Sequence, residues 1–392
     1  MVKRSLKLLL IAGCAAAVVP AAALAAPHRA VCPGPASAGH ARCHAHVVTD
    51  SAGSPKASRG PTGYGPAQFH GAYSLPTTGS TSQTIAIVDA YNDPTIASDL
   101  NNYDTTYGLP PCTTANGCFT KLNQNGLAGS YPSTNAGWSL EIALDVETAH
   151  QICQNCKVML VEANSSSLSN LNAAENTAVR LGATEISNSW GGGEYSSETA
   201  DQTFNHPGVA ITVASGDNGY GTFGYPAASP YVVAVGGTTL NVTPSNGYVS
   251  ESAWSGTGSG CSSYEAAQSW QRSLSDWAQT GCGTNRGVAD VAADADPNTG
   301  AAVYDTTRYQ GRSGWFQVGG TSLSSPLVAG VFALAGGTSS VSYAASIPYS
   351  HPGALHDVTS GSSGSCGTIM CNGGSGYDGP TGLGTPNGLG AF

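Results

Sequence analysis

The sequence at residues 319–326 reads Gly-Gly-Thr-Ser-Leu-Ser-Ser-Pro, and it runs directly into the apolar, small-residue segment 327–335. Glycines before the serine allow the backbone to approach a bound chain closely, and a proline is accommodated in the first turn of a helix. The pattern predicts a buried helix with Ser322 at its N-terminus, where developing negative charge is favoured. Ser322 is therefore a candidate nucleophile, although a helix-capping serine has the same local pattern.

A pair of carboxylates lies far upstream, in the run Trp-Ser-Leu-Glu-Ile-Ala-Leu-Asp at residues 138–145. This spacing places Glu141 and Asp145 on one face of a predicted helix over residues 140–152. A hydroxyl nucleophile needs a base to accept its proton, and such a pair can supply one. The alternative is the solvated face of an amphipathic helix, where two like charges at this spacing repel each other.

A third motif, Ser-Gly-Asp-Asn-Gly at residues 215–219, completes a set that resembles the sedolisins, the serine-carboxyl peptidases that share the subtilisin fold. The resemblance extends from about residue 64 to residue 392. It implies an endopeptidase that acts on polypeptide substrates, with these roles: nucleophile for Ser322, base for Glu141, orienting acid for Asp145 and oxyanion-hole donor for Asp217. The alternative is a sedolisin-like binding or structural protein that has lost activity.

The role of Asp217 predicts that the enzyme acts in acid. An oxyanion hole needs a hydrogen-bond donor, and a carboxyl group donates only when it is protonated. At neutral pH an ionised Asp217 repels the oxyanion, whereas in acid it becomes a neutral donor. The competing interpretation is an aspartate in a simple turn.

Asp89 departs from the usual sedolisin pattern and resembles the aspartate that ends a strand in true subtilases. Some sedolisins carry a glutamate there, together with a tryptophan that corresponds to Trp190, so the resemblance implies a supporting role for both residues. A loop residue that ends a strand is the alternative for Asp89. No histidine is predicted to open a helix in a His-Gly motif, and His150 is expected to be structural.

The run Ser-Asn-Ser-Trp-Gly-Gly at residues 187–192 resembles the backbone rail that binds substrate as an extra strand in subtilisin-like enzymes. Recognition of this kind uses main-chain hydrogen bonds for affinity. The resemblance implies that Ser189, Trp190 and Gly191 contact the substrate. The glycines could also mark only a transition from strand to loop.

The glycine-rich C-terminal region resembles the calcium site of the family. One structural Ca²⁺ is expected there, because this ion takes six or more oxygen ligands and carboxylates with backbone carbonyls supply them. The implied ligands are Asp357, Val358, Gly374, Gly376 and Asp378. A plain glycine-rich turn is the alternative.

Strand-like and helix-like segments alternate along the chain. Short β-rich runs occur at residues 84–89, 157–162, 185–189, 209–214 and 231–235, and helical candidates at residues 140–152 and 168–181. This alternation predicts an α/β fold with a mainly parallel sheet flanked by helices on both faces, and the resemblance makes it a subtilisin-like single catalytic domain over residues 63–392. Asp89 and Asp217 then lie at carboxyl ends of strands, where catalytic groups are expected.

The N-terminus predicts export. Three cationic residues precede an almost wholly apolar run over residues 8–26, with Ala-Leu-Ala at residues 23–25 as a cleavage pattern, so residues 1–25 are a predicted signal peptide of a secreted, extracellular protein. A lipoprotein anchored through Cys14 is the alternative. No later run is long enough to span a bilayer, so no membrane attachment is expected after signal cleavage.

Residues 26–62 are rich in Ala, Gly, Ser, Pro and His and show no sustained periodicity. They are interpreted as a short N-terminal extension or a remnant propeptide. Typical sedolisins carry a much longer propeptide, so the resemblance leaves three options: different maturation, unaided folding, or help from a separate partner.

Ten cysteines follow the predicted signal peptide and fall as close neighbours. Export permits disulfides, and sequential pairing is the prediction. The pairs are Cys32 with Cys43, Cys112 with Cys118, Cys153 with Cys156, Cys261 with Cys282, and Cys366 with Cys371. The Cys-Gln-Asn-Cys run at residues 153–156 could instead be a redox or metal half-site.

Composition excludes several classes of partner. Only 10% of the residues are charged, the formal net charge is −10, and no block rich in Lys or Arg occurs. A surface that binds nucleic acid or an anionic membrane is therefore not expected. The protein is expected to be a monomer. A surface with few ion pairs loses little stability when acid protonates its carboxylates, which suits an acidic medium.

Overall fold

The computed structural model describes residues 2, 25–79, 82–339 and 341–392. The predicted signal peptide, including Cys14, lies outside the described residues except for residues 2 and 25. Within the described part of the chain, no helix has both the length and the apolar character needed to cross a membrane.

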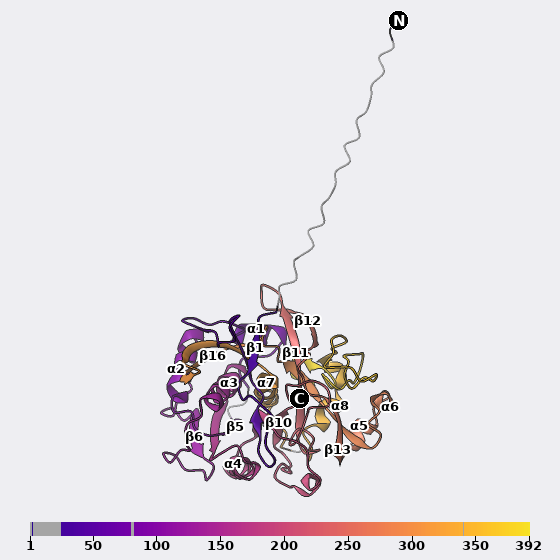
Figure 1. The fold of residues 1–392 in the computed structure, drawn as a ribbon, viewed down its shortest axis with the longest axis horizontal. Coiled ribbons are helices and arrows are strands. Elements are labelled where there is room, and N and C mark those ends of the chain that lie inside the picture. Colours follow the sequence, from indigo (N-terminus) through magenta and orange to yellow (C-terminus); the bar gives the residue numbers. More distant parts are fainter. Residues whose placement is uncertain (1, 3–24, 80–81, 340) are drawn as a thin grey trace.

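An eight-stranded sheet forms the centre of the molecule (Figure 1). Its strands, in spatial order, are β12 (Tyr248–Ala253), β11 (Val233–Val242), β10 (Ala210–Ala214), β8 (Glu185–Asn188), β5 (Thr84–Ala90), β7 (Lys157–Ala163) and β6 (Phe119–Asn123), with β15 (Val291–Asp294) also paired to β11. All of these pairs are parallel except that of β11 with β12. Six of the seven residues of β5 are buried, as expected for a parallel strand that is covered on both faces.

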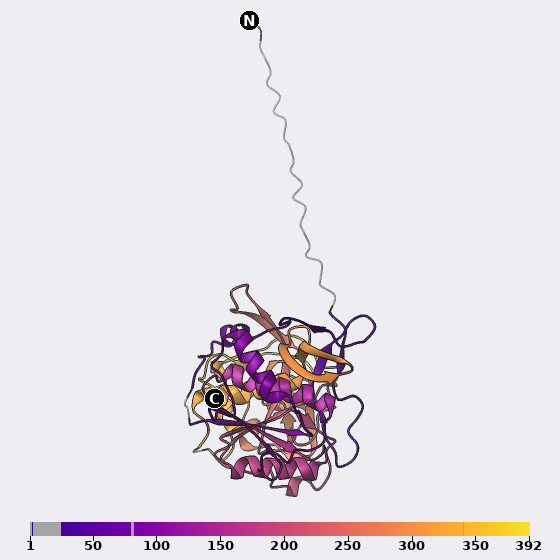
Figure 2. The same ribbon diagram turned by 90° about the vertical axis from the view of Figure 1, so that its left-hand side faces the viewer.

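Helices cover both faces of this sheet (Figure 2). On one face α3 (Ala136–Ile152) packs against α7 (Thr321–Ala335) and α2 (Ile96–Tyr107), while α4 (Leu168–Arg180) lies over β5 and β7 on the other face. The predicted α/β class is confirmed. The shorter helices are α1 (Pro66–Ala72), α5 (Ser269–Arg272), α6 (Trp277–Thr280) and α8 (Ser346–Ser350), with 3₁₀ turns η1 (Glu198–Ala200) and η2 (Pro352–Ala354).

The start of α7 differs from the prediction. The helix begins at Thr321, so Pro326 is its sixth residue and does not lie in the first turn. A proline there has no N–H to donate to the carbonyl of Ser322, four residues earlier. The hydroxyl of Ser189 donates to that carbonyl at 3.2 Å instead. The hydrogen bond from Ser189 takes the place of the one that Pro326 cannot make, and it connects the start of α7 to the predicted substrate rail.

The N-terminal segment is part of the folded body. An antiparallel sheet contains β1 (His28–Ala30), β3 (His46–Val48), β17 (Arg312–Gly319) and β16 (Ala301–Tyr309), with β4 (Ala57–Ser58) beside β17. Residues 26–62, interpreted from the sequence as a short extension or remnant propeptide, thus contribute strands to the fold. Their strands are only two or three residues long, which is too short for a hydrophobic period to appear in the sequence. Removal of this segment during maturation stays a prediction.

Three two-stranded sheets complete the pairing of the described strands. They are β2 (Arg42–Cys43) with β9 (Trp190–Gly191), β13 (Gly260–Ala266) with β14 (Asn285–Val288), and β18 (Leu355–His356) with β19 (Thr385–Pro386). All five predicted disulfides are present, including Cys153–Cys156. The sequential pairing is confirmed.

Candidate active site

Ser322 is the second residue of α7 and is fully buried. Its hydroxyl donates to the carbonyl of Ser189 at 3.2 Å and accepts the N–H of His44 at 3.1 Å. Gly320, at φ +99°, makes the close approach of the chain possible, because a Cβ there would overlap the His44 carbonyl oxygen and the Asp217 carboxyl. Ser322 therefore stands at a helix start that faces another stretch of backbone.

Glu141 and Asp145 lie on α3, where the helix packs against α7. Helix α3 begins after Asn135, whose side chain accepts the first free N–H groups as an N-cap. Both carboxyl groups are fully buried. Within the described residues no hydrogen bond of standard geometry reaches either of them. They are therefore on the inner face of the helix, as predicted.

Burial and neighbouring carboxyls change the titration of this pair. Burial and the nearby Asp89 raise the pKa of Glu141 well above its usual range, while the Ser322 hydroxyl and the Ala45 N–H act in the opposite direction. Burial and the adjacent Glu141 raise the pKa of Asp145. Because these groups interact closely, they titrate as one cluster. Glu141, the member beside the Ser322 hydroxyl, is best placed to exchange a proton with it.

Asp89 joins the same cluster from the sheet. It lies near the carboxyl end of β5, directly opposite Glu162 of β7 in the strand register. Burial, followed by Asp145 and Glu162, raises the pKa of Asp89. Glu162 forms a salt bridge of 3.2 Å with Lys121, and burial raises its pKa to about 7. No motif in the sequence marks Glu162, although its position at a strand end matches that of Asp89.

Trp190 supports the backbone beside this cluster. Its indole N–H donates to the carbonyl of Val88 at 2.8 Å, and the ring is fully buried. Since that is the only N–H of the side chain, it does not donate to the carboxyl of Asp89. The tryptophan therefore fixes the end of β5 rather than extending the carboxyl network.

Asp217 follows β10 and contacts Thr321 at the start of α7. Its Oδ1 accepts the N–H and the hydroxyl of Thr321 at 2.8 and 2.7 Å, whereas its Oδ2 has no hydrogen-bond partner among the described residues. Burial raises the pKa of Asp217 to about 7 against the effect of these bonds. His46 Nε2 lies 3.7 Å from Oδ2, but burial lowers the pKa of this imidazole to about 3, so the ring is neutral.

The predicted rail is the edge formed by Ser189 and β9, whose residues are buried. It is paired with residues of this same chain, since β2 runs antiparallel to β9 and the His44 N–H donates to the Ser189 carbonyl at 3.1 Å. The Ser189 hydroxyl also lies close enough to Asp145 to favour the ionised form of that carboxyl. Ser189, Trp190 and Gly191 thus lie together at the site, as predicted.

The predicted calcium residues lie on two adjacent loops. The N–H of Gly376 donates to Asp357 at 3.1 Å, and the N–H of Gly374 donates to Asp378 at 2.9 Å. Asp378 is fully buried, and burial, with a further contribution from Asp357, raises its pKa to about 7. Val358 directly follows Asp357 and is also buried. Two carboxyl groups on neighbouring loops, with no salt bridge in the described chain, fit a hard cation.

Known proteins share this arrangement of motifs. The model of the subtilase family matches residues 123–338. Sedolisin from Pseudomonas sp. (strain 101) is 30% identical over 369 residues, which cover 82% of this chain and 60% of that protein. This chain belongs to the sedolisin family. Another sedolisin-family protein, kumamolisin from Bacillus sp. (strain MN-32), is 30% identical over 371 residues, which cover 85% of this chain and 63% of that protein.

The sedolisin fold is also found in a solved structure. Pseudomonas sedolisin, described as a serine-carboxyl proteinase complexed with two molecules of pseudo-iodotyrostatin, matches with a TM-score of 0.70 and 28% identity, covering 83% of this chain and 96% of that chain. The predicted subtilisin-like fold is confirmed. The chain spans between 44% and 63% of the lengths of sedolisin, xanthomonalisin and kumamolisin.

The structure brings the sequence-predicted catalytic residues of this sedolisin-family chain to one place. Their catalytic roles stay predictions. His150, expected to be structural, is buried and its Nε2 contacts the Pro110 carbonyl at 3.0 Å and Asp104 at 3.2 Å. Sequence reasoning missed His44 and His46, because no local motif marks a strand that reaches the site from the N-terminal segment.

Proposed function

We propose that this chain is a secreted serine endopeptidase that hydrolyses polypeptides at acidic pH and works as a monomer. The observation that carries the proposal is the position of Ser322. Its hydroxyl lies between a substrate rail and buried carboxyl groups that approach from α3, β5 and the loop after β10. Serine-type peptide hydrolysis needs these parts: a nucleophile, a base, an oxyanion donor and a strand-binding edge.

In the proposed reaction Glu141 accepts the proton of Ser322 as Oγ attacks the substrate carbonyl carbon. Asp145 orients Glu141 and shares its charge, since the two carboxyls titrate together. Asp89 adds to the same cluster and disfavours a second negative charge in it. Glu141 then returns the proton to the leaving nitrogen.

Asp217 supports the acidic pH range. Its Oδ2 has no partner among the described residues and lies beside Gly320, next to the start of α7. A carboxyl whose burial raises the pKa to about 7 holds a proton in acid, and the protonated group donates to the oxyanion. Above that pH its negative charge opposes the oxyanion.

The proposal includes one Ca²⁺ held by Asp357 and Asp378 with backbone carbonyls of Val358, Gly374 and Gly376. When bound, the ion would neutralise two carboxylates and join the two loops that carry them. Secretion is supported by the leader-like N-terminus and by five disulfides, which persist in oxidising compartments. Polypeptides are the proposed partners, because the rail pairs with extended backbone.

Casein digestion between about pH 3 and pH 5 tests the proposal, since ordinary carboxyl groups titrate there. The wild type should digest casein and Ser322→Ala should not. Ser324→Ala is the matched control, because Ser324 is a buried serine of α7 whose hydroxyl bonds to the carbonyls of Ala293 and Asp294, away from the carboxyl cluster. Failure of the folded wild type to digest casein would favour the inactive binding protein.

A further inference from the structure

Tyr91 directly follows β5, two residues after Asp89. Its backbone has a φ of +65°, in the left-handed region that a residue with a side chain rarely adopts. Such a conformation costs stability, and residues held in it are concentrated at active sites and ligand-binding sites. Ligands of α/β folds also bind outside the carboxyl ends of the strands. Tyr91 therefore occupies a position where a contact with the substrate is expected.

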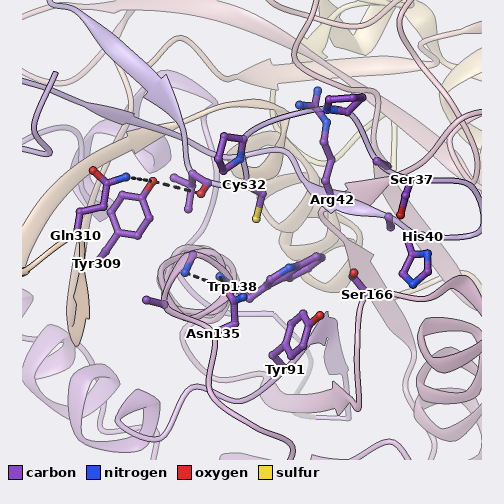
Figure 3. A pocket seen from close by; sticks show the side chains of 17 residues that line it. Cys32, Ser37, His40, Arg42, Tyr91, Asn135, Trp138, Ser166, Tyr309 and Gln310 are labelled. Carbon is purple, nitrogen blue, oxygen red and sulfur yellow. Dashed lines mark hydrogen bonds between the residues drawn. The ribbon is translucent and has the colours of Figure 1, made fainter.

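Tyr91 lines a cavity of about 590 Å³ (Figure 3). Its half-buried ring lies beside that of Trp138, with 6.3 Å between the two ring centroids. Trp138 is in the first turn of α3, three residues before Glu141. Since this spacing is about one turn of a helix, the cavity lies next to the proposed base.

The cavity also adjoins the substrate rail. Arg42 lies opposite Gly191 in the antiparallel pair of β2 with β9, and Arg42 is one of the residues that line the cavity. Two residues further along the chain, the N–H of His44 donates to Ser322 Oγ at 3.1 Å. A substrate strand that pairs with β9 in the same direction would therefore bring side chains that precede the scissile bond to the cavity.

The lining of the cavity favours one kind of side chain. Tyr91 and Trp138 are aromatic, and Val31 and Ala136 add apolar surface. Arg42 is a cation, whereas none of the described residues that line the cavity is Asp or Glu. Aromatic rings pack well against each other, and a Lys or Arg side chain would lie near a like charge without an acidic partner. The cavity therefore fits an aromatic side chain and disfavours a cationic one.

Lys121 of β6 holds the segment that follows Tyr91. Its ammonium group donates to Asn92 Oδ1 at 2.7 Å and to the backbone carbonyl of Asp93, and it forms a salt bridge of 3.2 Å with Glu162. The carboxyl of Glu162 in turn accepts the N–H of Asp93 at 2.9 Å. The pair of Lys121 and Glu162 therefore fixes the two residues after Tyr91 through both backbone and side-chain groups.

The same segment is bonded to α3 and to β7. The hydroxyl of Ser139, the residue after Trp138, donates to the Asn92 carbonyl at 3.2 Å. The N–H of Tyr91 donates to the carbonyl of Ala163, at the end of β7, at 2.8 Å. These bonds hold Tyr91 in its unfavourable backbone conformation and keep its ring beside that of Trp138.

We propose that Tyr91 and Trp138 form a pocket for an aromatic side chain of the polypeptide substrate, upstream of the scissile bond, and that Lys121 positions Tyr91 in this pocket. The inference rests on the proposed peptidase function and adds a substrate preference to it. Lys121 acts through its bonds to Asn92 and Asp93, so it is a positioning residue.

Peptides that carry Phe, Ala or Lys before the cleaved bond, with one position varied at a time, test the preference. The full chain is assayed at about pH 4, and kcat/KM is measured for each peptide. At one upstream position we expect Phe to exceed Ala by at least about tenfold, because the pocket buries an aromatic side chain, and Lys to be the poorest of the three. Equal rates for the Phe and Ala peptides at every upstream position would overturn the inference.

Variants of the two rings test the pocket. Tyr91→Gly removes the ring and suits the positive φ, so the protein should fold, and its preference for Phe over Ala should fall at least about threefold. Trp138→Leu should weaken the preference in the same way, whereas Tyr91→Phe keeps the ring and should keep the preference. Tyr264→Ala is the surface control, because Tyr264 is exposed on β13. A wild-type preference in folded Tyr91→Gly would overturn the pocket.

A lysine pair tests the positioning role. Lys121→Met keeps the apolar stem and loses the ammonium group, so for the Phe peptide KM should rise by a larger factor than kcat falls, and the preference for Phe should shrink. Lys121→Arg keeps a cation and should restore most of that preference. Lys157→Met is the matched control, because Lys157 is exposed at the start of β7. If Lys121→Met lowers only kcat and keeps the wild-type preference, Lys121 does not position Tyr91.

Two results separate this inference from the proposed function. A folded wild type that cuts the peptides without an aromatic preference would overturn the inference and leave the peptidase function standing. A folded wild type that cuts neither casein nor any of the peptides would overturn both.

Discussion

Two groups of buried carboxylates in this molecule differ in what surrounds them. Asp290 is fully buried and accepts two hydrogen bonds from the Arg286 guanidinium at 2.6 and 3.1 Å, one from the Tyr349 hydroxyl at 2.9 Å and one from the Ala234 N–H at 2.8 Å. Glu141 and its neighbours in the cluster at Ser322 are equally buried, yet no hydrogen bond of standard geometry reaches them within the described residues.

The comparison distinguishes a buried carboxylate that stabilises the fold, Asp290, from buried carboxyl groups that are available for catalysis, those around Glu141. A buried charge with a full set of partners holds its surroundings together, and loss of one partner is costly. Buried carboxyls without partners have raised pKa values, so the cluster carries fewer negative charges than it has carboxyl groups and shares its protons, which costs stability but leaves a proton carrier next to the nucleophile. The first group should therefore respond to substitution through stability, and the second through activity.

The largest expected effect is at Ser322 and Glu141. Ser322→Ala and Glu141→Gln should each lower kcat/KM by at least about a thousandfold, because residues that act as a unit in serine-type catalysis show losses of this size or more. Since Glu141→Gln removes an unpaired buried acid, its melting temperature should stay at or above that of the wild type. Peptide hydrolysis and thermal melting check both statements. A Glu141→Gln enzyme with the wild-type rate would remove Glu141 as the base.

The opposite pattern is expected at Arg286. Arg286→Ala leaves Asp290 buried without its cation and should destabilise the protein by about 3–5 kcal/mol. Measured in the folded protein, kcat/KM should change little. Arg308→Ala is the control, because the exposed Arg308 side chain should contribute within about 0.5 kcal/mol. Chemical denaturation in a Ser322→Ala background avoids self-digestion. If the two arginine variants are equally stable, the claim that the buried Arg286–Asp290 pair stabilises the fold is wrong.

Buried carboxyls with raised pKa values also make stability depend on pH. The pKa of Asp217 is raised from 3.8 to about 7 on folding, so the folded state binds its proton more tightly. The resulting stabilisation is complete below about pH 4 and is lost as the pH rises toward 7, a change of up to roughly 4 kcal/mol for one such group. Burial raises the pKa of Glu175 to about 8, so the loss of stability should continue above pH 7. Melting temperatures of Ser322→Ala that rise between about pH 4 and pH 7 would contradict this account.

A smaller effect is expected from removal of calcium. A chelator should lower the melting temperature, because an ion that binds only the folded state at a hundred times its Kd contributes about 2.7 kcal/mol. The variant Asp378→Asn should melt at the same temperature with and without chelator, since one of the two carboxylates is gone. If the melting temperature of the wild type is unchanged after prolonged chelation, the proposal that Asp357 and Asp378 bind calcium is wrong.

The sequence could predict that the candidate catalytic residues are special positions, because each lies in a local pattern. Glu141 and Asp145 are four residues apart on one helix, and Ser322 follows glycines before an apolar helix. Glu162 could not be found in this way, because its place next to Asp89 depends on the register of two strands that are far apart in sequence. Only pairing of the folded sheet reveals that neighbour.

The N-terminal segment shows the same limit more strongly. Residues 26–62 carry little local signal, since β2 has two residues and β3 has three. Their structure is imposed by long-range pairing to β9 and β17 and by the Cys32–Cys43 disulfide. The sequence did predict that disulfide, but not that His44, the residue after it, would contact Ser322.

The pH profile of kcat/KM for Asp217 variants tests the central claim, that buried carboxyls with raised pKa values perform the chemistry, most directly. Wild type, Asp217→Asn and Asp217→Ala are compared on one peptide substrate, with folding checked at each pH. Asp217→Asn keeps a donor that does not titrate, so its alkaline limb should move to higher pH with a lower maximum. Asp217→Ala should lose roughly 3 kcal/mol of transition-state stabilisation, about a hundredfold or more in rate. Three profiles of the same shape and height would place Asp217 outside the oxyanion hole and contradict the account.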